Sequence, residues 1–203
     1  MNKQAVLKQR VLLTGAGGAA AVAFWKALQH QTQVTFFMSD MSPYSSGLYL
    51  VPAAQRRLVK AGKDPQFIPH LYQLCCDLNI DVLVPTVDVE LLAIAEHHDL
   101  FRRVGIQVIN PNAAALRICT DKYQLMAHLH HRFALCYFSR FEPDMDLMSI
   151  PYPVIAKPCR GSGSEGIVKL ESPDDARLLQ AGTEYLLQEY LPGAEYSVDV
   201  YSG

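Results

Sequence analysis

The sequence predicts an α/β protein with an open, doubly wound parallel sheet followed by a smaller α+β lobe. Two observations lead to this prediction. In residues 1–110, short apolar runs alternate with segments of helical spacing, which is typical of βαβ units and a parallel sheet. After residue 112, a long helical stretch is followed by several short strand-like runs around one capped helix. We therefore expect two domains, residues 1–110 and 111–203, divided near Asn110-Pro111-Asn112.

The first domain is expected to be Rossmann-like. Its expected strands are rich in Val, Leu, Ile and Phe, as buried parallel strands are, and cover residues 11–14, 34–38, 80–85 and 105–109. The expected helices offer apolar side chains such as Phe24, Trp25 and Leu71 to a core. These helices cover residues 19–29, 69–78 and 89–98.

The second domain is expected to begin with a mostly helical stretch, residues 113–134. Strands are then expected at residues 154–157, 166–170, 185–189 and 196–201. A helix should start at Ser172, because serine is a good N-cap and Pro173 suits the first turn. Gly182 should end this segment.

Composition excludes several classes of function. Half of the 203 residues are hydrophobic and the formal net charge is −2, so no broad basic surface indicates nucleic acid or an anionic membrane. The apolar stretches are interrupted by glycine and lysine and are too short to span a membrane. No signal-peptide pattern opens the chain, and the five cysteines have no CxxC spacing. We therefore expect free thiols in a cytoplasmic protein.

A glycine-rich turn follows the first expected strand. Its sequence, Gly15-Ala16-Gly17-Gly18-Ala19-Ala20, fits the pattern GxGxxA, and Asp40 ends the next strand at the spacing of a ribose ligand. One interpretation is the dinucleotide site of an NAD(P)-dependent oxidoreductase, with Gly15, Gly17 and Gly18 at the pyrophosphate. The alternative is a structural or substrate-facing turn, because any tight strand-to-helix crossing requires small residues.

Two acidic residues, Asp88 and Glu90, follow the expected strand 80–85. Ligands bind beyond the carboxyl ends of strands in open α/β sheets, so these side chains, like the glycine turn and Asp40, are candidates for substrate contacts. The alternative is that Asp88 caps the next helix and Glu90 belongs to its acidic first turn.

A second glycine-rich loop lies in the stretch KPCRGSGSEG, residues 157–166. Lys157 ends a buried strand, where an ammonium group is costly unless it meets an anion. Glu165 is the one bulky side chain of the following loop, so its backbone N–H groups can close over phosphate oxygens. The loop is not a Walker loop, because no GK[ST] follows, and the alternative is a flexible hairpin with a solvated lysine.

Three further stretches accompany this loop: Thr120-Asp121-Lys122 upstream, then LLQEYLPG and AEYSVDV downstream. With TGAGG, SDMSPYSSGLY and VLVPTVDVELL in the first domain, they resemble the ATP-grasp superfamily. The chain is similar to relatives of the carbamoyl phosphate synthetase large chain and, more distantly, to biotin carboxylase and D-alanine–D-alanine ligase. Residues 1–110 resemble the domain that precedes the ATP-grasp, and the remainder resembles the ATP-binding small lobe at the start of the ATP-grasp itself.

The resemblance implies a role for each matching residue. Lys122 and Lys157 would contact ATP phosphates from two sides, and Glu195 would accept the ribose hydroxyls. A mobile flap over the phosphates would be formed by Gly161, Ser162, Gly163, Ser164 and Gly166. The adenine edge would meet Gln188, Glu189, Tyr190 and Leu191. Relatives often carry a basic residue where this flap has Glu165, which weakens the case for a second phosphate contact at that position. Whether Arg160 substitutes for that basic residue is left open.

The resemblance also implies an activity. The whole protein would be an ATP-dependent carboxylate–amine or carboxylate–thiol ligase that acts through an acyl phosphate. Its partners would be ATP and small-molecule carboxylate and amine substrates, and a homodimer is one arrangement left open. The family's Mg²⁺ ligands lie beyond the strand of Glu195, so we expect Mg²⁺ only with a missing C-terminal part and expect this chain to be an inactive fragment. A non-catalytic nucleotide-binding regulatory module is a further alternative.

Overall fold

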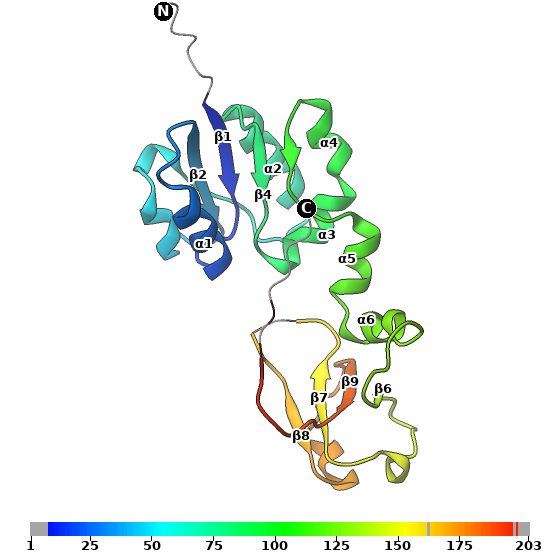
Figure 1. Ribbon diagram of the computed structural model, residues 1–203. Helices are drawn as coiled ribbons and strands as arrows, with labels where there is room; N and C mark the ends of the chain where they lie inside the picture. Colours follow the sequence, from blue (N-terminus) through cyan, green and yellow to red (C-terminus); the bar gives the residue numbers. More distant parts are fainter. Residues whose placement is uncertain (1–7, 162, 197, 199–203) are drawn as a thin grey trace, which may run out of the picture. The chain divides into compact units, whose positions relative to one another are not determined.

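The computed structural model describes residues 8–161, 163–196 and 198. The chain forms two compact units, Met1–Arg117 and Ile118–Gly203, and helix α5 (Ala113–Cys119) runs across the division. One unit contains a parallel sheet and the other an antiparallel sheet (Figure 1). The α/β fold class expected from the sequence is therefore confirmed.

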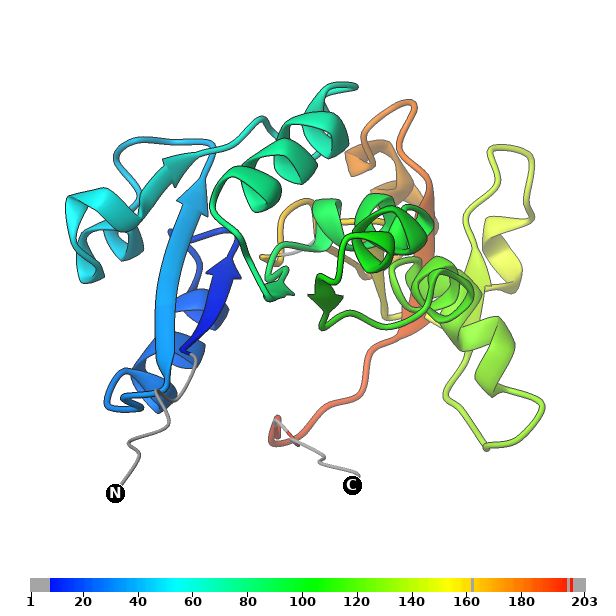
Figure 2. The same ribbon diagram turned by 90° about the horizontal axis from the view of Figure 1, so that it is seen from above.

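Five parallel strands form the sheet of the first unit (Figure 2). They are β1 (Gln9–Leu13), β2 (Val34–Asp40), β3 (Arg56–Leu58), β4 (Val82–Val84) and β5 (Gln107–Val108). Their order is β3-β2-β1-β4-β5, and every neighbouring pair is parallel. The order reverses beside β1, so the carboxyl ends of β1 and β4 mark the switch point at which open α/β sheets bind ligands.

Helices supply the apolar side chains that cover both faces of this sheet. They are α1 (Ala19–Leu28), α2 (Phe67–Asp77), α3 (Asp88–Glu96) and α4 (His98–Arg103). Phe24 and Trp25 of α1 pack with Val11 and Leu13 of β1. Leu12, between these two strand residues, belongs to a second core with side chains of α2, α3 and α4. Successive strand residues point to opposite faces, so the short strand β1 contributes to both cores.

The second unit is built on four antiparallel strands. They are β6 (Phe138–Arg140), β7 (Val154–Pro158), β8 (Val168–Leu170) and β9 (Tyr185–Glu189), in the order β6-β9-β7-β8. Helix α6 (Lys122–Leu129) precedes them, and 3₁₀ helices cover Leu147–Ser149 and Pro173–Leu178. The core contains Val154, Ala156, Leu170, Tyr185 and Leu187, which alternate along β7, β8 and β9.

Several local expectations differ from the structure. The helical stretch at 113–134 is two helices, α5 and α6, because Asp121 has an extended backbone and caps the second helix. The helix expected after Ser172 is a 3₁₀ helix that ends at Leu178. Strands β3 and β6 are missing from the sequence prediction. Of the expected strand 196–201, only residues 196 and 198 are described, and they form no strand.

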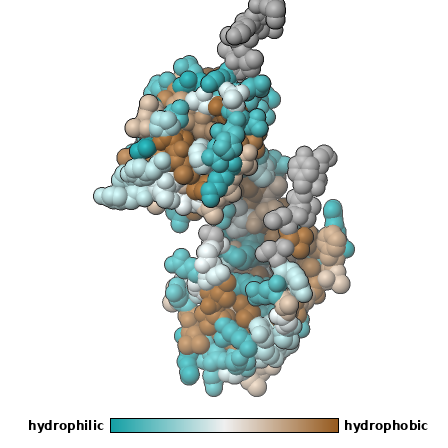
Figure 3. Space-filling view, turned by 60° about the vertical axis from the view of Figure 1, so that its left-hand side comes forward, coloured by the Kyte–Doolittle hydropathy of each residue, from teal (hydrophilic) through white to brown (hydrophobic). Residues whose placement is uncertain are grey.

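The surface shows no dominant apolar area in the view of Figure 3, where brown and teal regions alternate. Exposed apolar side chains include Met41 and Tyr44 in the first unit and Met148 and Leu191 in the second. Single exposed apolar side chains are normal on protein surfaces. Within the described ranges, every helix is too short or too polar to cross a membrane. All five cysteines are free, as expected.

Candidate functional site

The loop between β7 and β8 leaves open space around two of its glycines, Gly161 and Gly163. Gly161 and Gly163 adopt positive φ angles of 128° and 69°, a region that glycine enters without steric cost. A Cβ atom added at either position would meet no heavy atom within 4 Å. The loop backbone is therefore accessible on the side where these glycines lack side chains.

A pocket of about 240 Å³ lies between this loop and the start of helix α6. Two lysines line it, Lys122 from α6 and Lys157 from β7. The rest of the lining comes from the strand end and the loop: Pro158, Gly161, Gly163, Ser164, Glu165 and Ile167. The sequence did not indicate Ile167, which adds an apolar wall.

Lys122 is bonded to the base of the glycine loop. Its Nζ donates hydrogen bonds to the carbonyl oxygens of Pro158 at 3.1 Å and Gly161 at 2.8 Å. Its backbone N–H donates to the carbonyl oxygen of Cys159 at 2.8 Å. Lys122 is the first residue of α6, so the helix start and the loop base are held together.

Lys157 is held from the neighbouring strand. Its Nζ donates to Oε1 of Gln188 in β9 at 2.8 Å, and Nε2 of Gln188 contacts Sγ of Cys136 at 3.3 Å. The antiparallel register pairs Ile155 with Gln188, so Lys157 and Gln188 are close neighbours on adjacent strands. The amide of Gln188 thereby directs its oxygen toward the lysine.

Both lysines have neutral partners only. Within the described residues, neither Lys122 nor Lys157 forms an ion pair, and their hydrogen-bond acceptors are carbonyl and amide oxygens. Lys169 of the same unit differs, because its Nζ lies 2.7 Å from Oε1 of Glu171. Two ammonium groups without a carboxylate partner at one pocket favour the binding of an anion.

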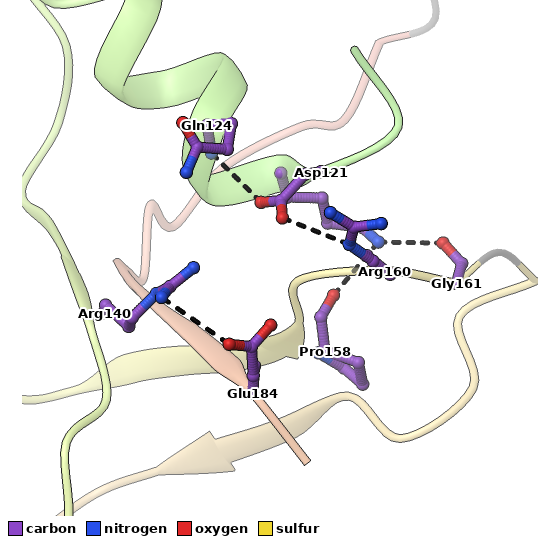
Figure 4. A network of polar contacts seen from close by, with 8 residues as sticks. Asp121, Gln124, Arg140, Pro158, Arg160, Gly161 and Glu184 are labelled. Carbon is purple, nitrogen blue, oxygen red and sulfur yellow. Dashed lines mark hydrogen bonds and ion pairs between the residues drawn. The ribbon is translucent and has the colours of Figure 1, made fainter. Parts of the chain in front are cut away.

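Asp121 and Arg160 form an ion pair beside the pocket (Figure 4). The Asp121 carboxylate is only 2% exposed, and it accepts the backbone N–H of Gln124 at 3.1 Å as the N-cap of α6. Nε of Arg160 lies 3.3 Å from its other oxygen. Sequence reasoning missed this pair, although an aspartate directly before a helix is a recognisable cap signal. A second ion pair in the same view joins Arg140 and Glu184 at 3.6 Å.

The space around the glycine turn after β1 is occupied by neighbouring residues of the protein. A Cβ atom added at Gly15 would overlap Cγ2 of Val87, and one added at Gly17 would lie 2.9 Å from Oγ of Ser45. Gly47 packs so closely that an added Cβ would overlap the carbonyl oxygen of Ala16. These glycines are therefore explained by close packing of neighbouring loops at the switch point of the sheet.

Asp40 joins β2 to this turn. Its Oδ2 accepts the backbone N–H of Gly17 at 2.8 Å, and its Oδ1 accepts that of Ser42 at 2.9 Å. Both carboxylate oxygens are thus engaged by backbone donors. These bonds give Asp40 a structural role in the turn, while each carboxylate oxygen keeps a lone pair for a further donor.

Glu90 and Asp88 have different environments at the start of α3. Glu90 is 5% exposed and accepts a hydrogen bond from the hydroxyl of Thr14. Burial raises the pKa of Glu90 above its ordinary value of 4.5; the Thr14 hydroxyl acts against this and the Asp40 charge adds to it. Asp88 is exposed and is the first helical residue, whereas the N-cap is Val87. The interpretation of Asp88 as the helix cap is therefore wrong, whereas the expected acidic first turn is confirmed, since it contains both Asp88 and Glu90.

Two family models match the chain in succession. The one described as the PylC-like, N-terminal domain matches residues 11–109, and the one described as the ATP-grasp domain matches residues 119–203. An ATP-grasp domain is thus recognised at residues 119–203. The likeness of the chain to the large chain of carbamoyl phosphate synthetase in particular stays a prediction.

Known proteins resemble this chain in sequence or in fold. The ATP-grasp enzyme fsqD of Aspergillus fumigatus is 29% identical over 107 residues, which are 48% of this chain and 18% of the relative. An L-amino acid ligase from Bacillus licheniformis has a TM-score of 0.66 at 12% identity, over 92% of this chain and 45% of that one. The biotin carboxylase–β-γ-ATP complex from Campylobacter jejuni has a TM-score of 0.60 at 18% identity, over 93% and 46%. The chain thus spans less than half the length of these relatives.

The residues expected to bind ATP do not all lie together in the second unit. Five of them line the pocket: Lys122, Lys157, Gly161, Gly163 and Ser164. Gln188 joins this group through Lys157. Gly166 packs against Pro158 outside the pocket lining, and Ser162 lies outside the described residues.

The end of β9 and the segment after it contain the other expected residues. Oε2 of Glu189 accepts the backbone N–H of Tyr137 at 3.2 Å, so this carboxylate helps to hold β6 against β9. The ring of Tyr190 lies 4.0 Å from Nζ of Lys169. Leu191 and Glu195 are exposed, and neither of them lines the pocket.

Proposed function

We propose that the pocket formed by Lys122, Lys157 and the glycine loop binds the phosphate chain of ATP. The observation that carries this proposal is the pair of ammonium groups, which come from two different elements, line one pocket and have only neutral partners. The ATP-grasp assignment and the nucleotide complex of the similar biotin carboxylase support ATP as the anion.

Each group would act on the phosphates in a defined way. Lys122 and Lys157 would exchange their carbonyl and amide partners for phosphate oxygens, which gain more from a cation than neutral acceptors do. The open space at Gly161 and Gly163 would let backbone approach the phosphates. The pocket volume of about 240 Å³ is below the range typical of sites for whole drug-sized ligands, so it suits a phosphate chain.

The adenosine would extend beyond this pocket. We propose that it lies along the end of β9, with Gln188, Glu189, Tyr190 and Leu191 at the adenine and Glu195 at the ribose. Gln188 supports this direction, because its side chain already contacts the pocket lysine Lys157. The glycine turn, Asp40, Asp88 and Glu90 would then lie in the domain that contributes to substrate binding.

For the whole protein we propose an ATP-dependent ligase of small molecules. ATP would supply the phosphoryl group that activates a carboxylate as an acyl phosphate, and an amine or a thiol would then displace the phosphate. The part of the chain that the structure describes contains no group of three or more His, Cys, Asp or Glu side chains suited to a metal ion. We therefore assign no step to Mg²⁺ and keep it as an expectation from the family.

Calorimetric titration of the 203-residue chain with ATP tests the site. Lys122→Met and Lys157→Met should each weaken binding by about 10-fold or more, because a hydrogen bond to a charged group contributes about 1.5–3 kcal/mol. Lys60→Ala is the matched control, since this lysine belongs to the first unit and pairs with Asp64. NAD⁺ is the control ligand.

The outcomes separate the candidate functions. ATP binding that is lost in both methionine variants and kept in Lys60→Ala would support the phosphate pocket. Binding of NAD⁺ that depends on Gly17 and Asp40 would replace this proposal with the oxidoreductase interpretation. ATP binding that both methionine variants retain would show that the nucleotide lies elsewhere.

A further inference from the structure

We propose that Asp121 and Arg160 act as a positioning pair that holds Lys122 and the base of the glycine loop in the geometry that receives phosphate. The proposal rests on the proposed ATP site. It assigns a role to two residues that do not line the pocket.

Asp121 makes two structural contacts, one through each of its carboxylate oxygens. One oxygen caps α6 by accepting the backbone N–H of Gln124 at 3.1 Å. The other lies 3.3 Å from Nε of Arg160, which is part of the loop base. The carboxylate is buried whereas the guanidinium is 67% exposed, so Arg160 is the cation that compensates a charge removed from water.

Four polar contacts join residues 121–122 to residues 158–161. Three come from Lys122, whose backbone N–H and Nζ donate to the carbonyl oxygens of Cys159, Pro158 and Gly161. The fourth is the ion pair between Asp121 and Arg160. When phosphate replaces the two carbonyls at Nζ of Lys122, the ion pair and the Cys159 contact are the two that stay. The ion pair would then keep the loop base in place after the ligand has taken the lysine.

Arg160 is placed to act through the loop base and not on the ligand. Lys122 and Lys157 line the pocket, whereas Arg160 is absent from the residues that line it. Arg160 pairs with the buried Asp121, which directly precedes Lys122 in the chain. Arg160 also offsets the Asp121 charge, so that this carboxylate does not compete with phosphate for the adjacent lysine.

The test uses four variants of the whole 203-residue chain. Asp121→Asn removes the charge but keeps a good N-cap, so helix α6 should stay intact. Arg160→Gln removes the other charge, and the third variant combines both changes. Arg160→Lys restores a cation that can make the single contact seen here. The two measurements are ATP affinity, by calorimetry, and amide hydrogen exchange of loop peptides covering residues 158–168 without ligand.

If the residues work as a pair, Asp121→Asn and Arg160→Gln should each lower ATP affinity about 5-fold or more, and the double variant should be no worse than either, because residues in contact are not additive. Both single variants should exchange faster in the loop peptides, and Arg160→Lys should recover part of both effects. Circular dichroism should show unchanged helix content in Asp121→Asn.

Other results would overturn the pair. Loss of ATP affinity in Arg160→Gln alone, with unchanged loop exchange, would make Arg160 a direct phosphate ligand. Losses that add in the double variant would mean two independent roles. If the unchanged protein binds no ATP, the proposed function fails by itself. Hydrogen exchange of the loop peptides then tests the positioning role separately. Equal exchange in all variants would exclude that role.

Discussion

Two glycine-rich turns follow strands of this protein, and they have opposite surroundings. In the turn after β1, an added Cβ at Gly15 or Gly17 would meet Val87 or Ser45. In the loop after β7, an added Cβ at Gly161 or Gly163 would meet no atom within 4 Å. The first set of glycines lets the protein pack on itself, and the second leaves space that a ligand can enter.

The charged side chains at the two turns also differ in whether the protein itself already engages them. At the first turn, Asp40 is occupied by two backbone N–H groups and Glu90 by a threonine hydroxyl. At the second, Lys122 and Lys157 have neutral partners and line a pocket. A glycine-rich motif is thus weak evidence for a phosphate site, and the decisive features are the free space and the unpaired cations around it.

The largest expected effect is in the packed region, for Gly47→Ala. The new Cβ would overlap the carbonyl oxygen of Ala16, and backbone cannot yield as a flexible side chain does. We expect a loss of about 3 kcal/mol in the unfolding free energy, at the upper end of the usual cost of overpacking. Trp25, the single tryptophan, packs in the core of this unit and reports its unfolding by fluorescence in a denaturant titration.

Gly17→Ala is the graded control for this prediction. Its Cβ would lie 2.9 Å from Oγ of Ser45, a side-chain atom that can move, so the loss should be smaller. Ser45→Ala in the same chain should recover part of it. An equal stability of Gly47→Ala and the unchanged protein would show that the first turn is not tightly packed, and the contrast between the two turns would disappear.

The core elements of the fold could be predicted because their sequences carry the signal locally. Strands β1, β2 and β4 are apolar runs, and α1 has alanine with aromatic side chains at helical spacing. Strand β3 could not be predicted, because Arg56 and Arg57 are not typical strand residues. It forms at the edge of the sheet because β2 extends to Asp40 and offers it hydrogen-bonding partners.

Part of the site depends on contacts between distant segments. The lysines could be predicted, since Lys157 ends a buried strand and the surrounding stretches resemble a known family. The bond between Lys157 and Gln188 depends on the register of β7 and β9, and the Asp121–Arg160 pair joins residues 39 positions apart. No local pattern encodes such pairs, so the sequence alone left them unassigned.

A second prediction concerns the buried carboxylate near the packed turn. The folded-state pKa of Glu90 is raised above 4.5, so the folded protein holds this proton more tightly than the unfolded chain does. The contribution of Glu90 to stability therefore falls as pH rises from about 4.5 through the folded-state pKa. Glu90→Gln keeps an oxygen that accepts from Thr14 and removes this dependence.

The measurement is the difference in unfolding free energy between Glu90→Gln and the unchanged protein, followed by Trp25 fluorescence from pH 4 to pH 8. Relative to the unchanged protein, the variant should gain stability across this range, by about 1.4 kcal/mol for each unit by which folding raises the pKa of Glu90. A difference that stays constant with pH would mean that Glu90 is not destabilised by burial. The packed turn would then accommodate the ionised Glu90 carboxylate without a loss of stability, and this difference between the two turns would disappear.

The smallest expected effect belongs to the open loop. Gly163→Ala introduces no clash, and its main cost is the positive φ of 69°, about 1 kcal/mol for an alanine that keeps this conformation. Gly182→Ala is a matched control in the same unit, with a φ of 79° and equally open space, but outside the phosphate pocket. Both variants should therefore stay folded. Only Gly163→Ala should lower ATP affinity in calorimetry, because an alanine there disfavours the loop conformation that would close over the phosphates. Equal ATP affinities in the two variants would show that the shape of the loop at Gly163 does not matter for binding, leaving the two lysines as the main determinants of the open site.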